Sequence, residues 1–246
     1  MQTSFIKGLS IDWNAVAADS YLHRITGLRR IHSLALPGAV TFLVGENGTG
    51  KSTLLEAIAV AYGFNPEGGT LNYRFSTFED VSPLSAAVRL VRGPKRARDC
   101  FFFRAESFFN VASKAEDYRM GDAKEVFYAR YGGRALHEQS HGESFLAWFQ
   151  SLRGDGLYLM DEPEAALSPQ RQLTLLLQIH EMARQGAQFI IATHSPILLG
   201  LPEGQILNFS ETGVAPCRYE DTDSYIITKM FVNDRQAMLR HLLEEE

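Results

Sequence analysis

The feature that most constrains this chain is a glycine-rich stretch, Gly45 to Thr53, which fits the pattern G-x-x-x-x-G-K-[ST] at every fixed position. Its glycines let the backbone turn so that successive N–H groups point inward at a polyphosphate, and a following helix places its positive end there. Lys51 then supplies a positive charge for the β- and γ-phosphates, and Ser52 supplies a hydroxyl ligand for Mg²⁺. The motif therefore predicts a phosphate-binding loop.

The segments on either side are those that such a loop requires. Val40 to Val44 is a short, mostly apolar run, which is typical of a strand buried in a parallel sheet. Ser52 to Ala61 has the apolar spacing of a helix, whose N-terminus would face the phosphates. This context argues against a glycine-rich surface turn.

A second apolar run, Gly156 to Glu164, contains the adjacent carboxylates Asp161 and Glu162 near its end. Ligands of parallel sheets collect at the carboxyl ends of the strands, so both carboxylates are expected at the functional edge of the sheet. Phosphoryl transfer needs positioning and charge neutralisation. One carboxylate can therefore act through Mg²⁺ while the other faces the attacking water.

A third buried strand is predicted over Ala187 to Ala192, and it ends in the sequence Thr193 to Pro196. The helix before it is expected to begin at Ser168 and Pro169, a cap followed by a proline at the first helical position. A single histidine is more often a core residue than a functional one. His194, however, follows a buried strand beyond the Asp-Glu pair, and we expect it to be functional.

A strand pair with a basic tip is also predicted. Ser85 to Arg92 and Asp99 to Arg104 are expected to form a hairpin around Gly93 and Pro94. Nucleic-acid contact is one interpretation of this tip, but a charge run is also typical of a solvated surface. The residues that would contact nucleic acid are Arg92, Lys95, Arg96 and Arg98.

The remaining segments divide between strands and helices. Alternating apolar residues predict further strands and a late hairpin that turns at Gly213, and helical periodicity predicts one or two amphipathic helices near the C-terminus. The strands are Ser4–Ile11, Ile31–Leu36 and Thr70–Thr77, the hairpin is Gln205–Arg218, and the helices lie in Tyr225–Leu243.

Composition limits the classes to which the chain can belong. Its 246 residues, 45% of them hydrophobic, can build one sizeable core, and a formal net charge of −5 does not favour a general nucleic-acid coat. Cys100 and Cys217 fit no zinc spacing, which indicates reduced thiols. No secretion signal or run long enough to span a membrane is present. We therefore expect a soluble, cytoplasmic protein without membrane insertion.

Together with the stretch Gln139 to Ser144, these motifs resemble the nucleotide-binding domain of ATP-binding cassette (ABC) ATPases, in the compact stand-alone prokaryotic form with some SMC-like features. The resemblance covers about Val40 to Pro196. It implies an α/β fold of the P-loop NTPase type, with a mainly parallel core sheet, an antiparallel β subdomain and a small helical insert. We expect a single domain over residues 1–246, with the insert at about 106–150.

The resemblance implies roles for individual residues. Ser52 and Asp161 would bind Mg²⁺, directly or through water. The catalytic residues would be Lys51, Glu162, which polarises the attacking water, and His194, which resembles the switch histidine that contacts the γ-phosphate. The loop residues that would contact ATP are Glu46, Asn47, Gly48, Thr49, Gly50, Lys51, Ser52 and Thr53.

A second set of residues resembles the elements that act across a dimer. Ser140, Gly142 and Glu143 resemble the signature sequence, which contacts the ATP held by a second subunit, and Ala165 to Ser168 resembles the loop that crosses the interface. His141 stands where the transporter signature has glycine, and Glu143 where it has glutamine. Acidic variants at that last position are familiar in SMC-type and other non-transport ATPases.

A further departure concerns the glutamine that the family usually places between these motifs to sense Mg²⁺. No glutamine occurs after Lys51 until Gln139, which already adjoins the signature. Glu106 is the expected substitute as a metal ligand, although it could instead cap the next helix.

These features predict Mg-ATP binding and hydrolysis coupled to ATP-dependent, head-to-tail homodimerisation. The unusual signature and the basic hairpin favour a non-transport system of the DNA-repair or defence type, acting with a protein partner that the sequence does not identify. Two alternatives stay open. One is the nucleotide-binding subunit of an ABC transporter, and the other is an interaction module that hydrolyses ATP slowly.

Overall fold

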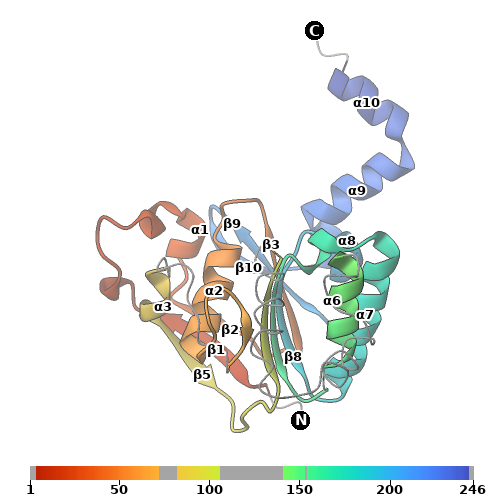
Figure 1. Cartoon of the computed structure of the whole chain (residues 1–246). Helices are drawn as coiled ribbons and strands as arrows, with labels where there is room; N and C mark the ends of the chain where they lie inside the picture. The colour runs from red at the N-terminus through yellow and green to blue at the C-terminus, as the bar shows by residue number, and fades with distance from the viewer. Residues whose placement is uncertain (1–3, 72–81, 106–140, 153, 244–246) are drawn as a thin grey trace.

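The computed structural model describes residues 4–71, 82–105, 141–152 and 154–243, which build a seven-stranded sheet with helices on both faces (Figure 1). The strand order is β10-β9-β3-β8-β7-β6-β4. In that order the strands are Gly213–Cys217, Gln205–Ser210, Val40–Gly45, Gln188–Ala192, Leu157–Asp161, Cys100–Arg104 and Gly69–Thr70. All neighbours from β9 to β6 run parallel, and β10 and β4 pair antiparallel at the edges. The predicted α/β fold with a mainly parallel sheet is therefore confirmed.

The three strands that carry the predicted functional motifs are neighbours in this sheet. β3, β8 and β7 lie side by side, and β7 and β8 are buried along their whole length. Because they run parallel, their carboxyl ends lie at one edge of the sheet. The fold thus brings the phosphate loop, the carboxylate pair and His194 to that edge.

A second sheet, in the order β2-β1-β5, forms the antiparallel unit that the sequence predicts. Its strands are Ser33–Ala35, Ile6–Ile11 and Val88–Arg92. The predicted hairpin around Gly93 and Pro94 is wrong, because β5 pairs with β1 in this sheet whereas β6 pairs with β7 in the core sheet. Burial explains the difference: β6 is buried from Cys100 to Phe103, while β5 is buried only at Val88.

One buried side chain joins the two sheets. Gln188, at the start of β8, is 1% exposed. Its Oε1 accepts a hydrogen bond from the Ile6 backbone N–H at 2.8 Å, and its Nε2 donates to the Ile6 carbonyl oxygen at 2.7 Å. The glutamine thus pairs with β1 as a neighbouring strand would.

Helices cover the core sheet in two layers (Figure 1). One layer shares a hydrophobic core with the small sheet, and the other packs around Phe145, Phe149 and Phe189. The first contains α1 (Thr26–Arg29), α2 (Lys51–Tyr62) and α3 (Leu84–Ala87), and the second contains α6 (His141–Gln150), α7 (Pro169–Arg184) and α8 (Pro196–Leu199). Short 3₁₀ turns are Trp13–Ala15 (η1), Tyr21–Arg24 (η2), Pro163–Ala166 (η4) and Tyr219–Asp221 (η5). The predicted helices after the phosphate loop and after Ser168 are confirmed.

The chain ends in two helices, α9 (Asp223–Asn233) and α10 (Arg235–Leu243), which project away from the body (Figure 1). They confirm the predicted C-terminal helices, yet none of their residues is buried. None of the helices in the described ranges has the length and apolarity needed to cross a membrane. Most of the predicted strand Thr70–Thr77 and residues 106–140 of the predicted insert lie outside the described residues.

Candidate functional site

The phosphate loop connects β3 to α2 and is shaped by glycines with positive φ angles. Gly45 has φ +133°, and Gly50, the residue before α2, has φ +95°. A side chain on Gly45 would overlap the carbonyl oxygen of Phe209 in β9. Because Gly50 has no side chain that could cap α2, the first backbone N–H groups of this helix face the loop. The loop therefore offers backbone donors at a helix N-terminus, as a phosphate site requires.

Lys51 is held inside this loop. Its side chain is 5% exposed, and its Nζ donates to the carbonyl oxygens of Gly45 at 2.7 Å and Glu46 at 2.8 Å. Burial lowers the pKa of the Lys51 ammonium, while Glu162 and Asp161 act in the opposite direction. A poorly solvated cation in this position is well placed to bind a phosphate oxygen.

Ser52 and Asp161 meet across the site. The Ser52 Oγ, in the first turn of α2, donates to Asp161 Oδ1, at the end of β7, at 2.9 Å. The Asp161 side chain is buried, at 8% exposure. A hydroxyl and a carboxylate beside a phosphate loop form an oxygen donor set of the kind that Mg²⁺ prefers. The residues that are present therefore fit this ion.

Glu162 follows Asp161 in a strained conformation. Its φ of +49° is the only positive φ at a non-glycine position among the described residues. Its backbone N–H donates to the Ala192 carbonyl oxygen at 2.9 Å, and its side chain is exposed. The turn thus fixes the backbone and projects the carboxylate outward at the edge of the sheet.

His194 lies just beyond β8 and is tied to the loop that follows Glu162. Its backbone N–H donates to Glu164 Oε1 at 2.6 Å. The His194 Nε2 and Glu164 Oε2 atoms are both buried without a hydrogen-bond partner among the described residues. A buried imidazole nitrogen without a partner, beside a cavity that the phosphate loop also lines, is suited to pair with a phosphate oxygen.

A second contact links the same two loops. The Ser195 Oγ donates to Gln172 Oε1 at 2.6 Å, and Gln172 Nε2 donates to the Leu167 carbonyl oxygen at 3.0 Å. The roles of Glu164 and Gln172 were missed from sequence. Glu164 carried one usable signal, because it lies in the turn directly after the Asp-Glu pair, whereas Gln172 carried none.

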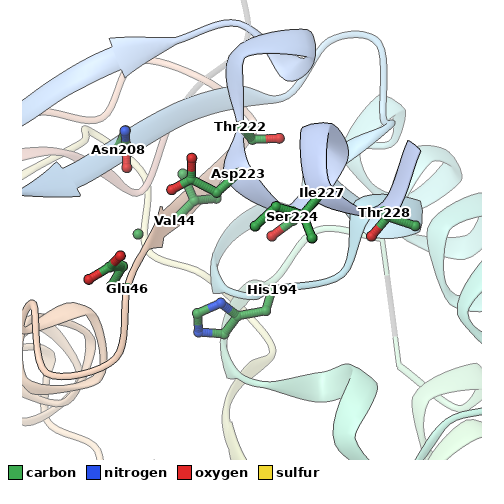
Figure 2. A pocket seen from close by; sticks show the side chains of 10 residues that line it. Val44, Glu46, His194, Asn208, Thr222, Asp223, Ser224, Ile227 and Thr228 are labelled. Carbon is green, nitrogen blue, oxygen red and sulfur yellow. The ribbon is translucent and has the colours of Figure 1, made fainter. Parts of the chain in front are cut away.

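A cavity of about 450 Å³ opens beside these residues. Glu46 and His194 line one side of it, and Asp223 and Ser224 of α9 line the other (Figure 2). Asn208, near the end of β9, also contributes. The sequence did not indicate that α9 begins at the phosphate loop.

Several predicted site residues are not placed beside this cluster. Ser140 and Glu106 lie outside the described residues. Gly142 and Glu143 lie in the first turn of α6, where the structure describes the helix and not the side chains. The signature and the substitute metal ligand therefore stay predictions.

The basic segment makes contacts within the chain. The Arg92 guanidinium lies 4.9 Å from the centre of the Tyr62 ring and donates to the Ala61 carbonyl oxygen at 3.2 Å. Arg98 pairs with Asp155 at 3.7 Å. Lys95 and Arg96 are exposed. Two of the four predicted nucleic-acid residues thus have structural partners, which favours the solvated-surface interpretation.

Sequence comparison finds one family whose profile matches residues 40–121 and 136–200. That family is described as "AAA domain, putative AbiEii toxin, Type IV TA system". The matched segments span β3, the phosphate loop, the Asp-Glu pair and His194, and together they cover more than half of the chain.

Individual relatives are ATP-binding proteins of import systems. The chain is 27% identical over 183 residues to "Hemin import ATP-binding protein HmuV" of Chelativorans sp. (strain BNC1), covering 68% of this chain and 70% of that one. It is 24% identical over 212 residues to "Ribose import ATP-binding protein RbsA" of Roseobacter denitrificans, covering 76% of this chain and 40% of that one.

Similar solved structures include the MJ1267 ATP-binding cassette of an ABC transporter. It is 17% identical, with a TM-score of 0.48, and the match covers 84% of this chain and 89% of that one. The cbiO1 subunit of the cbiONQ transporter complex from Clostridium perfringens is 16% identical, with a TM-score of 0.46, and the match covers 87% and 91%.

Proposed function

The chain belongs to the family described as "AAA domain, putative AbiEii toxin, Type IV TA system" and is an ABC-type ATPase, and on that premise we propose how its residues bind and hydrolyse Mg-ATP. The observation that carries the proposal is the Ser52–Asp161 hydrogen bond of 2.9 Å. It joins the phosphate loop to the end of β7, and so brings two motifs that are distant in sequence to one point.

Different groups of the site would bind the phosphates and the metal ion. Lys51 and the backbone N–H groups of the loop bind the phosphates, while Ser52 and Asp161 would hold Mg²⁺. When bound, this ion would neutralise negative charge on the phosphate oxygens. The carbonyl oxygens of Gly45 and Glu46 keep the Lys51 ammonium in place before ATP arrives. Little reorganisation is then needed on binding.

Hydrolysis requires an oriented water molecule. Glu162, whose carboxylate is exposed beside Asp161, accepts a hydrogen bond from that water and takes up its proton. His194 directs Nε2 toward the γ-phosphate and holds it in line with the water. The unpaired state of this nitrogen supports the assignment.

We place a second copy of the chain over this edge, in a head-to-tail homodimer. Ser140, Gly142 and Glu143 of each copy would contact the ATP held by the other, and Ala165 to Ser168 would cross the interface. Glu106 is retained as a candidate metal ligand. The exposure of Glu162 supports this arrangement, because a second copy would exclude solvent from the attacking water.

Among the processes that this ATPase could serve, transport has the most support. The two relatives described above are import ATP-binding proteins, so we propose a nucleotide-binding subunit that acts in the cytoplasm on a membrane permease. The DNA-repair interpretation, and with it the nucleic-acid contact, has no such support. A defence function is the second candidate, because the family description names a toxin-antitoxin system.

A Glu162→Gln variant tests the mechanism. It should keep ATP affinity but hydrolyse ATP at least about 10²-fold more slowly, because water orientation and proton transfer have effects of that size. Calorimetry and phosphate release measure the two quantities. With ATP the variant should form dimers, and without ATP monomers, as measured by light scattering after size exclusion.

A Lys51→Ala protein is the matched control and should lose most ATP affinity. Unchanged affinity in this control, or a Glu162→Gln protein that hydrolyses ATP at the wild-type rate, would contradict the proposal. Affinity capture from detergent-solubilised membranes of the native host distinguishes a transport function from a defence function. A permease in the complex favours transport, and a partner without membrane spans favours defence.

A further inference from the structure

The helix α9 carries a wide face of exposed apolar side chains. Ile226 and Ile227 are 39% and 56% exposed, and Met230, Phe231 and Val232 are 56%, 39% and 74% exposed. Consecutive residues of a helix point in directions about 100° apart, so Ile226, Ile227, Met230 and Phe231 fall within an arc of about 140°, while Thr228, Lys229 and Asn233 lie outside that arc. An apolar stripe of this width on a helix normally packs against other apolar surface.

The body of the protein covers little of this helix. Tyr225 packs against Tyr219 with ring centres 4.6 Å apart, which anchors the first turn. No residue of α9 or α10 is buried. The two helices have 11 and 9 residues, whereas isolated helices shorter than about 12–15 residues are marginal in water. Packing against a partner would therefore stabilise them.

The position of α9 indicates which partner this is. Its residues Asp223, Ser224 and Ile227 line the same cavity as Glu46 and His194 (Figure 2). A second copy seated over the bound nucleotide would therefore meet α9 directly.

A groove of about 480 Å³ lies on another side of the helix. Leu173, Ile197 and Val232 are among the residues that line it. Leu173 is 53% exposed, and Leu242 and Leu243 of α10 are 61% and 77% exposed. Exposed apolar side chains thus lie in this groove and on α10 as well as on α9.

The charge of the segment favours a protein partner over a lipid surface. Residues 223–243, which span the two helices, contain three basic and two acidic residues, and Glu244 to Glu246 follow them in the sequence. Helices that lie on membranes are rich in lysine and arginine on their polar face, which this segment is not.

We propose that α9 and α10 form a dimerisation arm, which packs against a second copy of this chain when two copies share ATP. The proposal rests on the proposed function, because it requires the two-copy site. Beyond that function, we infer that the arm and the signature both contribute contacts between the two copies. Binding of ATP would then order the arm.

Substitutions in the arm test the proposal in the Glu162→Gln protein, where ATP persists. Met230→Asp with Val232→Asp should weaken the ATP-dependent dimer at least about tenfold, because two carboxylates would enter an apolar contact. ATP affinity per subunit should not change. Val91→Asp is the matched control, since Val91 is 54% exposed in β5 and should leave the dimer intact. Light scattering over a concentration series gives the dissociation constants.

Hydrogen exchange of residues 223–243, with and without ATP, is the second measurement. Slower exchange in the Glu162→Gln dimer supports the arm. Equal dimerisation of the arm variant and the Val91→Asp control would overturn the arm and leave the proposed function standing. A Glu162→Gln protein that binds ATP but stays monomeric would overturn both the two-copy mechanism and the arm. Loss of ATP binding in the Glu162→Gln protein would instead contradict the proposed ATP site.

Discussion

Glu162 carries a conformational cost, which its proposed function would explain. A non-glycine residue in the left-handed region is strained by about 1–2 kcal/mol, and its position is fixed by the backbone hydrogen bond to Ala192. Such strain persists where a side chain must point in a required direction. Here the required direction is outward from the edge of the sheet, beside Asp161.

Glu162→Gly should therefore separate stability from activity. Glycine relieves the strain, so the free energy of unfolding should rise by about 0.5–1 kcal/mol, while hydrolysis should fall by at least about 10²-fold. Thermal unfolding without nucleotide and phosphate release measure both effects. Glu162→Gln, which keeps the strained backbone, should lose activity without any rise in the free energy of unfolding. A melting temperature that falls in the glycine variant would contradict the argument.

Glu164 is expected to position His194. Glu164→Ala removes the acceptor of the His194 N–H, which should loosen the histidine and lower kcat about tenfold while changing the KM for ATP by less than about threefold. Glu164→Gln keeps an oxygen at Oε1 and should restore most of the activity. Steady-state kinetics measure the two constants. If the alanine and glutamine variants lose kcat equally, the hydrogen bond does not position the histidine.

At the level of single residues, the sequence identified those functional residues that belong to a recognisable motif. Lys51, Ser52 and Asp161 have side chains that phosphate and Mg²⁺ require, and the structure brings them together. Glu164 and Gln172 act on other protein groups, His194 N–H and Ser195 Oγ. Their roles depend on how two loops approach each other, which spacing along the chain does not reveal.

Strands were predictable where burial is continuous. The runs that became β3, β7 and β8 are mostly apolar, with Thr41, Asp161 and Gln188 as exceptions, because parallel strands are covered on both faces. The same rule would have placed β6 in the core sheet, but the nearby Gly93 and Pro94 suggested a local turn. Pairing between adjacent strands is only a tendency, and here the burial of Cys100 to Phe103 outweighed it.

The attachment of the small sheet depends on Gln188. Gln188→Met should leave the Ile6 N–H and carbonyl group without their buried partner, and each such group costs about 1–3 kcal/mol. We expect the free energy of unfolding to fall by about 2–4 kcal/mol in urea denaturation. Gln205→Met is the matched control, because it removes a single, longer hydrogen bond, that of 3.4 Å from the Thr41 hydroxyl, and should cost less than half as much as Gln188→Met. Equal losses in the two variants would exclude a special role for Gln188.

At the scale of the whole molecule, the layers could be predicted and the placement of the C-terminal helices could not. Two apolar layers on a parallel sheet follow from the alternation of strands and helices. The helical pattern of Tyr225 to Leu243 says that helices form, but not that α9 begins beside His194. That position is set by the β9-β10 hairpin, which pairs with β3 at the edge of the phosphate loop.

The position of β3 in the sheet has a consequence for biosynthesis. β3 belongs to the first fifth of the chain, yet its two neighbours, β8 and β9, belong to the last quarter. Contacts between such distant segments form slowly, and they require that β8 and β9 have already been translated. If translation stopped midway, the incomplete polypeptide would contain the whole phosphate motif. It would lack β8 and β9, the strands that pair with β3 and shape the loop. Incomplete products therefore could not compete with the finished ATPase for the nucleotide.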